Sequence, residues 1–415
     1  MSMKKPKIRF KGYTEDWEQR KLEDFGKATG GTSIESEFSE DGVYKVISIG
    51  SYSENSVYND QGIRAIKSDK TSNRVLNRND LTMILNDKTT SGNIIGRVLL
   101  IEESGIYVYN QRTERIEINL DEYAPVFLYE MLNAPNIREK IIKQAQGNTQ
   151  IYVNWTTISL LEYMIPSKEE QVKIGEHLHG ISNLITLHQR KCNQAEKLKK
   201  YMHQKMFPQN GEKNPEIRFD GFTDDWEQRK LGDIADLTSS KRVHAQDYVD
   251  SGIPFYRGKE ISELREHKPV SEVLYITEEK YKEMAKLYGS PQVGDLLITA
   301  VGTIGNTWVV DNVPFYFKDG NLIWFKNIKC NPNYLDYVLS SDDGQKKIDA
   351  SAIGSNQKAL TMVKMNELEF MFPNDDEQVR IADYFRTLDH LITLHQRKCD
   401  ELKKIKKFML QNMFV

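Results

Sequence analysis

Four kinds of short stretch contain residue types that could do chemistry. Asn331–Tyr334 reads NPNY, which is close to the NPPY-type motifs that hold the target base in amino-methyltransferases. Glu401-Leu402-Lys403 supplies the Glu-x-Lys pair of some nucleases, and the glycines of VGTIGN at 301–306 could cradle a phosphate. His188 and His395 could each ligate a metal ion. Taken alone, these stretches would suggest a methyltransferase, a nuclease or a metal site.

The surroundings of each stretch favour a structural interpretation. Pro332 of NPNY has a counterpart in Pro125, 207 residues earlier, so both prolines suit the first turn of a helix. No FxGxG-like cofactor loop accompanies NPNY, and no GxxxxGK[ST] phosphate loop occurs, which argues against an ATPase. The Glu-x-Lys pair and both histidines fall in long helical patterns, and VGTIGN reads as strand–turn–strand. We therefore predict no catalytic residue, no metal site and no cofactor bound by this chain.

Composition sets further limits on function. The 415 residues are 39% hydrophobic and 28% charged, an ordinary globular balance, with no leader-like or membrane-spanning run. Because the net charge is −3, a nucleic-acid partner would need local basic surfaces. The three cysteines form no CxxC pair, which argues against a zinc cluster or a disulfide framework and suits a reducing compartment. We therefore predict a cytoplasmic location and no membrane partner.

The chain is an internal duplication. IRFKGYTEDWEQRKLED at 8–24 returns as IRFDGFTDDWEQRKLGD at 217–233, and LITLHQRKC at 184–192 returns letter for letter at 391–399. The period of about 207 residues is too long for a solenoid repeat and indicates duplication of a whole domain. The borders of the two copies agree closely, whereas their middles hardly align. This contrast predicts a shared framework that carries two separate specificities.

The pattern of each copy predicts an α+β domain followed by a long helix. Short β-rich runs punctuated by Gly, Asn and Asp fill the middle, and helices begin near Pro125 and Pro332. Capping-box patterns at 167–170 and 374–377 begin the two long helices. The predicted ranges are 1–166 for the first recognition domain, 167–206 for its helix, 207–216 for a linker, 217–373 for the second recognition domain and 374–415 for its helix.

Both long helices carry a coiled-coil seam, because small or apolar residues recur in alternating steps of four and three. A near-repeat along one chain favours a pseudo-twofold arrangement, so we predict that the helices pack as an antiparallel coiled coil. The expected packing residues of the first helix face those of the second: Ile174, Leu178, Ile181 and Ile185 against Phe385, Leu388 and Ile392.

Polar loops near the middle of each copy have the side chains needed to read base edges and to neutralise phosphates. In the first copy they are 86–93, 109–115 and 146–154, and in the second we expect 239–244, 256–260 and 353–360 as their respective counterparts. The predicted DNA-binding residues are Lys88, Thr89, Arg112, Asn148 and Gln150 in the first copy, and Lys241, Arg242, Lys259, Asn356, Gln357 and Lys358 in the second.

Over nearly its full length, the chain resembles the specificity subunit of type I restriction–modification systems. The resemblance rests on the paired DWEQRKLxD openings at 16–24 and 225–233, and on the paired P…EQ helices that contain LITLHQRKC. It implies two target-recognition domains that each bind half of an interrupted double-stranded DNA site, with the packed helices setting the gap. It also implies two docked methyltransferase (modification) subunits, and restriction–translocase subunits that join through the complex. S-adenosylmethionine, ATP and Mg are then expected on those partner subunits.

Two alternatives from other classes remain open on the residues alone. One is a stand-alone DNA adenine methyltransferase or nuclease that uses NPNY or the Glu-x-Lys pair. The other is a coiled-coil scaffold with no role on DNA. Methylation of DNA by the chain without a partner would favour the first, and a complete complex that selects no sequence would favour the second.

Overall fold

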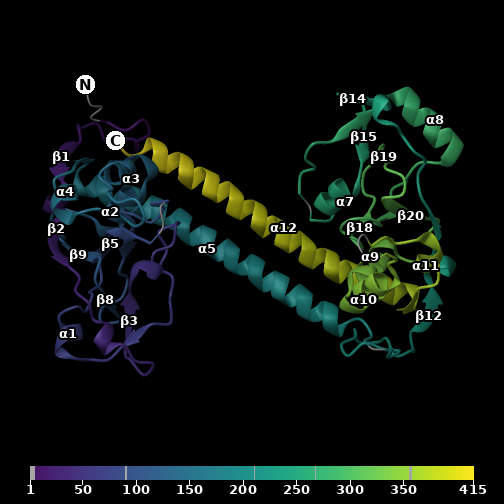
Figure 1. Cartoon of the computed structure of the whole chain (residues 1–415), viewed down its shortest axis with the longest axis horizontal. Helices are drawn as coiled ribbons and strands as arrows, with labels where there is room; N and C mark the ends of the chain where they lie inside the picture. Colours follow the sequence, from purple (N-terminus) through teal and green to yellow (C-terminus); the bar gives the residue numbers. More distant parts are fainter. Residues whose placement is uncertain (1–4, 89–90, 210, 267, 355–357) are drawn as a thin grey trace. The chain divides into compact units, whose positions relative to one another are not determined.

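The computed structural model describes residues 5–88, 91–209, 211–266, 268–354 and 358–415, which fall into two compact units. One unit comprises residues 1–188 with 398–415, and the other comprises residues 189–397. The long helices α5 (Lys168–Lys205) and α12 (Asp375–Asn412) each contribute one part to either unit (Figure 1). The ranges predicted from the sequence, with each helix separate from its domain, therefore divide the chain differently from these compact units.

The first unit is built on an antiparallel four-stranded sheet in the order β2-β9-β5-β7. A second sheet, β4-β3-β8, pairs β3 with β8 in parallel, and β1–β11 and β6–β10 form short antiparallel pairs. Short helices connect and cover these strands. The elements are β1 (Glu18–Lys21), η1 (Leu22–Phe25), β2 (Gly26–Gly30), η2 (Glu35–Glu37), β3 (Tyr44–Ile47), η3 (Ile49–Ser51), β4 (Arg64–Ala65), α1 (Asp69–Ser72), β5 (Leu81–Ile84), β6 (Asn86–Asp87), β7 (Val98–Leu100), β8 (Tyr107–Tyr109), β9 (Thr113–Ile118), α2 (Pro125–Asn133), α3 (Pro135–Ile142), β10 (Ile151–Tyr152), α4 (Trp155–Ile158) and β11 (Glu162–Ile165).

The second unit repeats this plan. Its four-stranded sheet runs β13-β20-β17-β18, its second sheet runs β14-β16-β15-β19, and β12 pairs with β21. As in the first unit, the second sheet contains one parallel pair, here β15 with β19. The elements are β12 (Glu227–Lys230), α6 (Leu231–Ile234), β13 (Asp236–Thr238), η4 (Ala245–Asp247), β14 (Tyr248–Val249), β15 (Ile253–Tyr256), α7 (Gly258–Arg265), β16 (Leu274–Ile276), α8 (Glu278–Tyr288), β17 (Leu296–Thr299), β18 (Thr307–Val309), β19 (Tyr316–Phe317), β20 (Leu322–Lys326), α9 (Pro332–Ser340), α10 (Asp342–Ser351), α11 (Met362–Asn366) and β21 (Glu369–Phe372). The α+β fold and the tandem duplication predicted from the sequence are confirmed.

The matched strands correct two of the expected loop correspondences. The segment 239–244 follows β13, so its counterpart is the segment after β2 and not 86–93. The segment 256–260 begins with the last residue of β15, which matches β3, so its counterpart is not 109–115. The strands β3 and β15 keep the offset of 209 residues that separates the two DWEQRKL openings, but the sequence did not reveal the match because the middles of the two copies hardly align. The pairing of 146–154 with 353–360 keeps the offset of 207.

Each long helix is attached to its domain by a buried Arg–Glu pair. Arg9 donates two 2.7 Å hydrogen bonds to the Glu170 carboxylate, and Arg218 binds Glu377 in the same bidentate way at 2.7 Å. Both glutamate side chains are fully buried, and the arginine side chains are only 13% and 14% exposed. The pairs account for two of the duplicated motifs, IRF and P…EQ, because Arg comes from the first and Glu from the second.

The glutamine after each buried glutamate extends the same attachment. Gln171 accepts a 3.0 Å bond from the Ala124 N–H at the start of α2, and its amide donates to the carbonyl of Pro166 at 3.0 Å. Gln378 makes the equivalent bonds to Asn331 and Pro373. The long helix, the strand before it and the helix beneath it are thereby fixed to one another.

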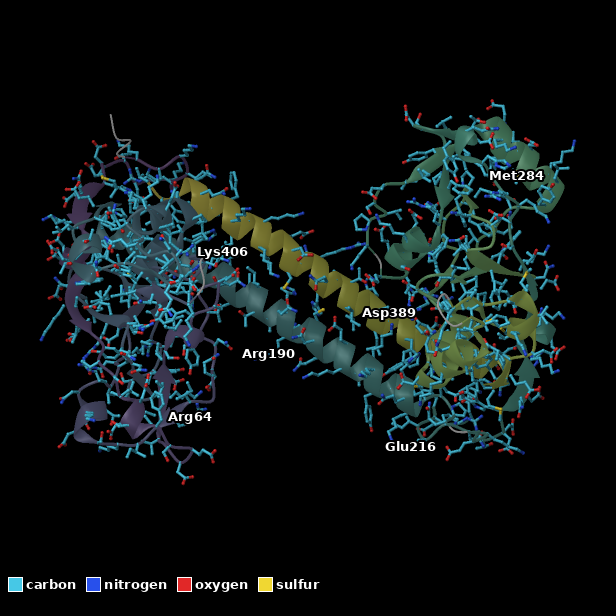
Figure 2. All side chains as sticks on the ribbon, viewed as in Figure 1. Arg64, Arg190, Glu216, Met284, Asp389 and Lys406 are labelled. Atoms are coloured by element: carbon cyan, nitrogen blue, oxygen red, sulfur yellow. The ribbon has the colours of Figure 1, made fainter. Side chains whose placement is uncertain are left out.

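Within each unit, the two long helices run antiparallel, as predicted. In the first unit the Cys399 thiol donates to the Ile185 carbonyl at 3.3 Å, and Lys406 donates to Ser182 at 2.6 Å. In the second, Cys192 donates to the Ile392 carbonyl at 3.8 Å. Higher residue numbers on one helix thus meet lower numbers on the other. Lys406 and Asp389 of α12 are labelled in Figure 2. No helix in the described part of the chain is long and apolar enough to cross a membrane.

The expected packing residues lie on the buried side of the helices, but their pairing differs from the prediction. Ile174 and Leu178 belong to the first core with Met413 and Phe414, whereas Phe385 and Leu388 belong to the second core with Phe207. Ile181 is buried, and Ile185 and Ile392 are half-buried. The prediction that the two sets face each other is therefore wrong, because a 3.5-residue period defines a seam but not the register of an antiparallel pair.

We expect Arg218→Ala to lower the free energy of unfolding of the second unit by about 3–5 kcal/mol, because it leaves a buried carboxylate without its partner. Chemical denaturation would measure the loss. Arg20→Ala is the matched control: it removes the exposed 2.6 Å Arg20–Glu18 pair and should cost about 0–1 kcal/mol. Equal losses in the two variants would show that Arg218 and Glu377 do not anchor the helix.

Candidate nucleic-acid interface

The three polar loops of the first domain meet around β6. Leu85, just before β6, donates its N–H to the Arg112 carbonyl at 2.9 Å and accepts from Val153 at 2.9 Å. Asp87 of β6 lies opposite Ile151 of β10. Three stretches that are far apart in the sequence are thus brought to one place by backbone hydrogen bonds. Four predicted DNA-binding side chains are exposed there: Lys88, Arg112, Asn148 and Gln150. Thr89 lies outside the described residues.

A tight hairpin displays Asn148 and Gln150. Gln146 and Tyr152 exchange backbone hydrogen bonds of 2.9 and 3.0 Å across its base. Gly147 has a φ of +94°, and a Cβ there would lie 2.2 Å from the Gln150 carbonyl oxygen, so only glycine fits. The tip is consequently held by its backbone, and its amide side chains are left free to face solvent.

In the second domain the predicted segments are linked through the β19–β20 region. Ser240 donates to the Phe317 carbonyl at 2.7 Å, and Tyr256 accepts from Lys318 at 2.9 Å. Ala300 donates to Asn321 and accepts from Leu360, both at 2.8 Å. The segments that contain Lys241, Arg242, Lys259 and Lys358 are therefore neighbours in the fold. Asn356 and Gln357 lie outside the described residues.

The basic side chains of the second domain differ in their electrostatic partners. Lys259 pairs with Glu272 at 2.8 Å and Lys358 with Asp349 at 2.7 Å. Lys241 lies 5.8 Å from the centre of the Tyr288 ring. All of these lysines are exposed, and exposed ion pairs contribute only about 0–1 kcal/mol, so either lysine can exchange its carboxylate for a phosphate at little cost.

The buried carboxyl of Glu114 lies within one of the predicted loops but was not singled out from the sequence. The residue is 6% exposed. Burial raises the pKa of Glu114 to about 7, and the charge of Arg74 opposes this shift. Across the sheet, Gly30 leaves room for the carboxyl, because a Cβ there would lie 3.3 Å from Glu114 Oε2. No sequence signal marked Glu114, because Gly30 becomes its neighbour only through the pairing of β2 with β9.

The chemical motifs of the sequence have structural roles. Asn331 caps α9, where it accepts bonds from Asn333 and Tyr334 at 3.0 and 3.1 Å, and Pro332 is at the first turn, as predicted. Tyr334 is fully buried, so its ring is not available to stack on a base. VGTIGN joins β17 to β18 with both glycines at positive φ, as predicted for strand–turn–strand. The described residues contain no group of three or more potential ligands that could hold a metal ion.

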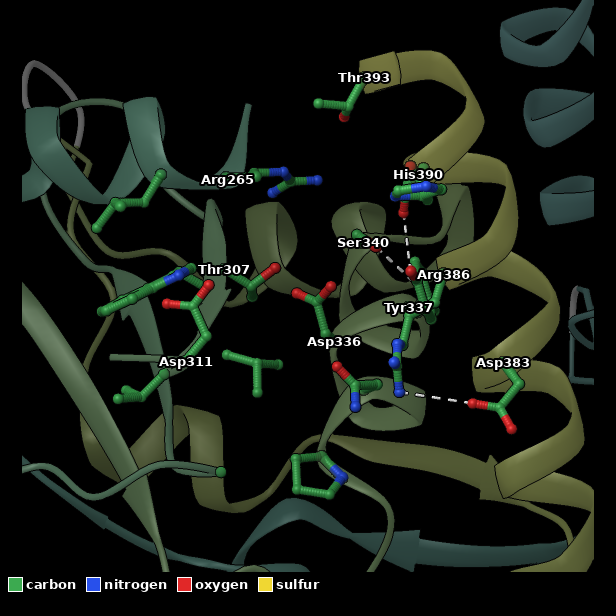
Figure 3. Close-up of a pocket in the computed structure, with 18 of the residues that line it drawn as sticks. Arg265, Thr307, Asp311, Asp336, Tyr337, Ser340, Asp383, Arg386, His390 and Thr393 are labelled. Atoms are coloured by element: carbon green, nitrogen blue, oxygen red, sulfur yellow. Dashed lines mark hydrogen bonds and ion pairs between the residues drawn. The ribbon is translucent and has the colours of Figure 1, made fainter. Parts of the chain in front are cut away.

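The second unit contains a cleft of about 1100 Å³ between α9, β18 and α12 (Figure 3). Asp336 projects from α9 into it, and burial raises the pKa of this carboxyl. In the first unit the equivalent of Asp336 is Tyr129, which donates to the Ser56 carbonyl at 3.0 Å and so ties the 53–57 loop over α2. The two copies therefore differ beside the helix as well as at the loops.

Comparisons with known proteins agree on one family. Two stretches, 14–197 and 223–404, match the family described as "Type I restriction modification DNA specificity domain". The type I restriction enzyme MjaVIII specificity subunit of Methanocaldococcus jannaschii is 23% identical over 413 residues, 95% of this chain and 91% of that protein. The MjaIX specificity subunit of the same organism is 25% identical over 197 residues, 46% of this chain and 44% of that protein. The crystal structure of the type I S subunit from M. genitalium shares the fold, with a TM-score of 0.68, 15% identity and 99% of both chains covered.

We expect Glu114→Gln to remove a pH dependence of stability. The carboxyl has a pKa of about 7 when folded and an ordinary value of 4.5. Its contribution is therefore full below pH 4.5 and is lost as the pH rises through 7. From pH 5 to pH 8 the wild type should lose stability and the glutamine variant should not. The free energy of unfolding of the variant minus that of the wild type should therefore rise by on the order of 2–3 kcal/mol over this range. Denaturation at both pH values would measure this, and a gain of the same size from the exposed Glu117→Gln would contradict the assignment.

Proposed function

The chain belongs to the family of type I restriction–modification DNA specificity domains, and we propose that it reads a bipartite DNA target with one domain for each half-site. It is a specificity subunit with two tandem recognition domains, the non-catalytic recognition component of such a system. The observation that supports two half-sites is the contrast between the copies. The strand order of their main sheets and their helix attachments agree, whereas the side chains at their loops differ.

The loops supply the chemistry that such reading needs. In the first domain Lys88 and Arg112 can meet phosphates or guanine edges, and Asn148 and Gln150 can pair with adenine. In the second domain Lys241, Arg242, Lys259 and Lys358 provide the cations. We assign the first group to one half-site and the second group to the other, together with Thr89, Asn356 and Gln357.

We further propose that two methyltransferase subunits dock on a duplicated apolar surface of the long helices. Four exposed positions of α5 recur on α12 at an offset of 207, namely Leu184, Leu187, Leu198 and Tyr201, and Leu391, Leu394, Ile405 and Phe408. Their exposed fractions run from 37% to 55%. Steps of 3 and 14 residues put the four positions of each helix on one side of it, away from the seam that contains Cys192 or Cys399. One unit carries Leu184, Leu187, Ile405 and Phe408, and the other carries the equivalent residues Leu391, Leu394, Leu198 and Tyr201. This equivalence suits one identical partner on each unit.

The cofactors of the reaction belong to the partners in this proposal. S-adenosylmethionine would bind the methyltransferase subunits, and ATP and Mg would bind restriction subunits that join the complex. The whole assembly would act on cellular DNA, and we therefore propose that this chain is located in the cytoplasm.

We expect Arg112→Ala in the assembled complex to relax one position of the first half-site by about 1–3 kcal/mol of discrimination and to leave the second half-site intact. Mapping of methylated adenines would show the change. Arg242→Ala is the control and should act on the other half-site alone. If both variants relaxed the same half-site, the assignment of one domain to each half-site would be wrong. Methylation by the purified chain alone, with labelled S-adenosylmethionine, would instead favour a stand-alone enzyme.

We expect Leu187→Asp to remove one methyltransferase subunit, because a carboxylate would be desolvated at the interface. Leu394→Asp should remove the other, and the double variant should remove both. Native mass spectrometry would count the subunits. The control is Thr186→Asp, at an exposed neighbour outside the apolar stripe, which should keep full stoichiometry. Retention of both subunits by the double variant would exclude this surface.

A further inference from the structure

Arg138 of α3 holds the loop that leads from β6 to β7. Its guanidinium donates to three backbone carbonyls of that loop, those of Gly92 at 3.0 Å, Asn93 at 2.6 Å and Ile95 at 2.9 Å. The residue is 8% exposed. Burial lowers the pKa of Arg138 to about 10. Within the described residues it makes no salt bridge with a carboxylate, so the carbonyls are its main compensation. A buried guanidinium without a carboxylate partner destabilises the fold unless these hydrogen bonds to carbonyls are made.

The second domain uses the same position differently. Gln345 of α10 is the equivalent of Arg138 at the offset of 207. Its amide donates to the Gly305 carbonyl at 3.0 Å and to the Leu339 carbonyl of the neighbouring helix α9 at 2.8 Å. The loop it holds is about six residues shorter than its counterpart. The longer loop is thus held by the longer side chain: Arg138 binds three of its carbonyls, whereas Gln345 binds one carbonyl of the shorter loop.

The held loop is continuous with the candidate interface. Ile94 donates its N–H to the Asp87 carboxylate at 3.2 Å, which connects the Arg138-bound turn back to β6. Asp87 is 4% exposed and lies opposite Ile151, the residue that follows the Asn148–Gln150 tip. Movement of residues 92–95 would therefore displace both Lys88 and the base of the hairpin.

We propose that Arg138 is a positioning residue for the first half-site: it fixes the loop next to Lys88 and the hairpin, although it need not touch DNA itself. The inference rests on the proposed function, because it takes these loops to be the reading surface. Gln345 has the lesser equivalent role in the second domain, since it makes only one contact with its loop.

The test uses the full chain assembled with its methyltransferase subunits. Methylation rates are compared for the cognate target, for targets altered in the first half-site and for targets altered in the second. Arg138→Gln, which installs the side chain of the second copy, should reduce discrimination at the first half-site about tenfold and leave the second unchanged. Arg138→Lys keeps the charge and some donors, so it should restore part of the discrimination. Gln345→Ala is the matched control and should affect only the second half-site.

The outcomes separate the inference from the proposed function. A wild-type complex that discriminates at neither half-site would refute the proposed function itself. A selective wild type with an unchanged Arg138→Gln variant would overturn the positioning role. Equal loss at both half-sites in the two Arg138 variants would also overturn it, since general destabilisation cannot distinguish the half-sites. If Arg138→Gln does not fold, Arg138→Lys decides by the same comparison.

Discussion

One buried carboxylate in each unit, Glu170 or Glu377, determines how its long helix begins. Water cannot reach either side chain, so the charge is tolerable only where a bidentate arginine meets it. That requirement sets the rotation of the helix and the path of the segment that brings Arg9 or Arg218. The adjacent glutamine then ties the start of α2 or α9 to the same place. The sheets, the covering helices and the loops at their ends are all placed relative to these attachments.

The framework could be predicted from the sequence because its signals are local. Capping boxes, prolines at first turns and the identical LITLHQRKC segments are each read within a few residues, and the helices and the duplication followed from them. The correspondence of the central loops was predicted wrongly, because the β strands are short and the residues in the middles of the two copies hardly align. The register of the two long helices also could not be predicted. It depends on pairs such as Cys399 with the Ile185 carbonyl, which are seen only in the structure. Loop polarity indicated Lys88 and Arg112, but no pattern marked Arg138 or Glu114, whose roles depend on burial.

The same three equivalent positions make a polar contact between the long helices and a short helix in both copies, but with different side chains. In the first unit Lys406 of α12 binds the Glu130 carboxylate of α2 at 3.0 Å and the Ser182 hydroxyl of α5. In the second unit Lys199 of α5 binds the Asp389 carboxylate of α12 at 2.5 Å, and the Tyr337 hydroxyl of α9 donates to the same carboxylate at 2.8 Å. The carboxylate and the hydroxyl have exchanged places between the short and the long helix. Both units retain one lysine, one carboxylate and one hydroxyl, so the kind of contact is the same although the residues that make it differ.

The closure of the first core carries a consequence for synthesis on the ribosome. Met413 and Phe414 are buried among the residues of that core, which includes Leu178, and the Phe414 ring meets that of Phe127. These two residues emerge more than two hundred positions after α5, and domains otherwise tend to fold in the order in which they are made. The nascent first domain must therefore wait with part of its apolar surface open until the second copy has been translated. Met206 and Phe207, the equivalent pair in the second core, have already emerged when that domain needs them. Two copies of one fold thus face unequal delays, and the earlier one depends longer on whatever shields nascent chains.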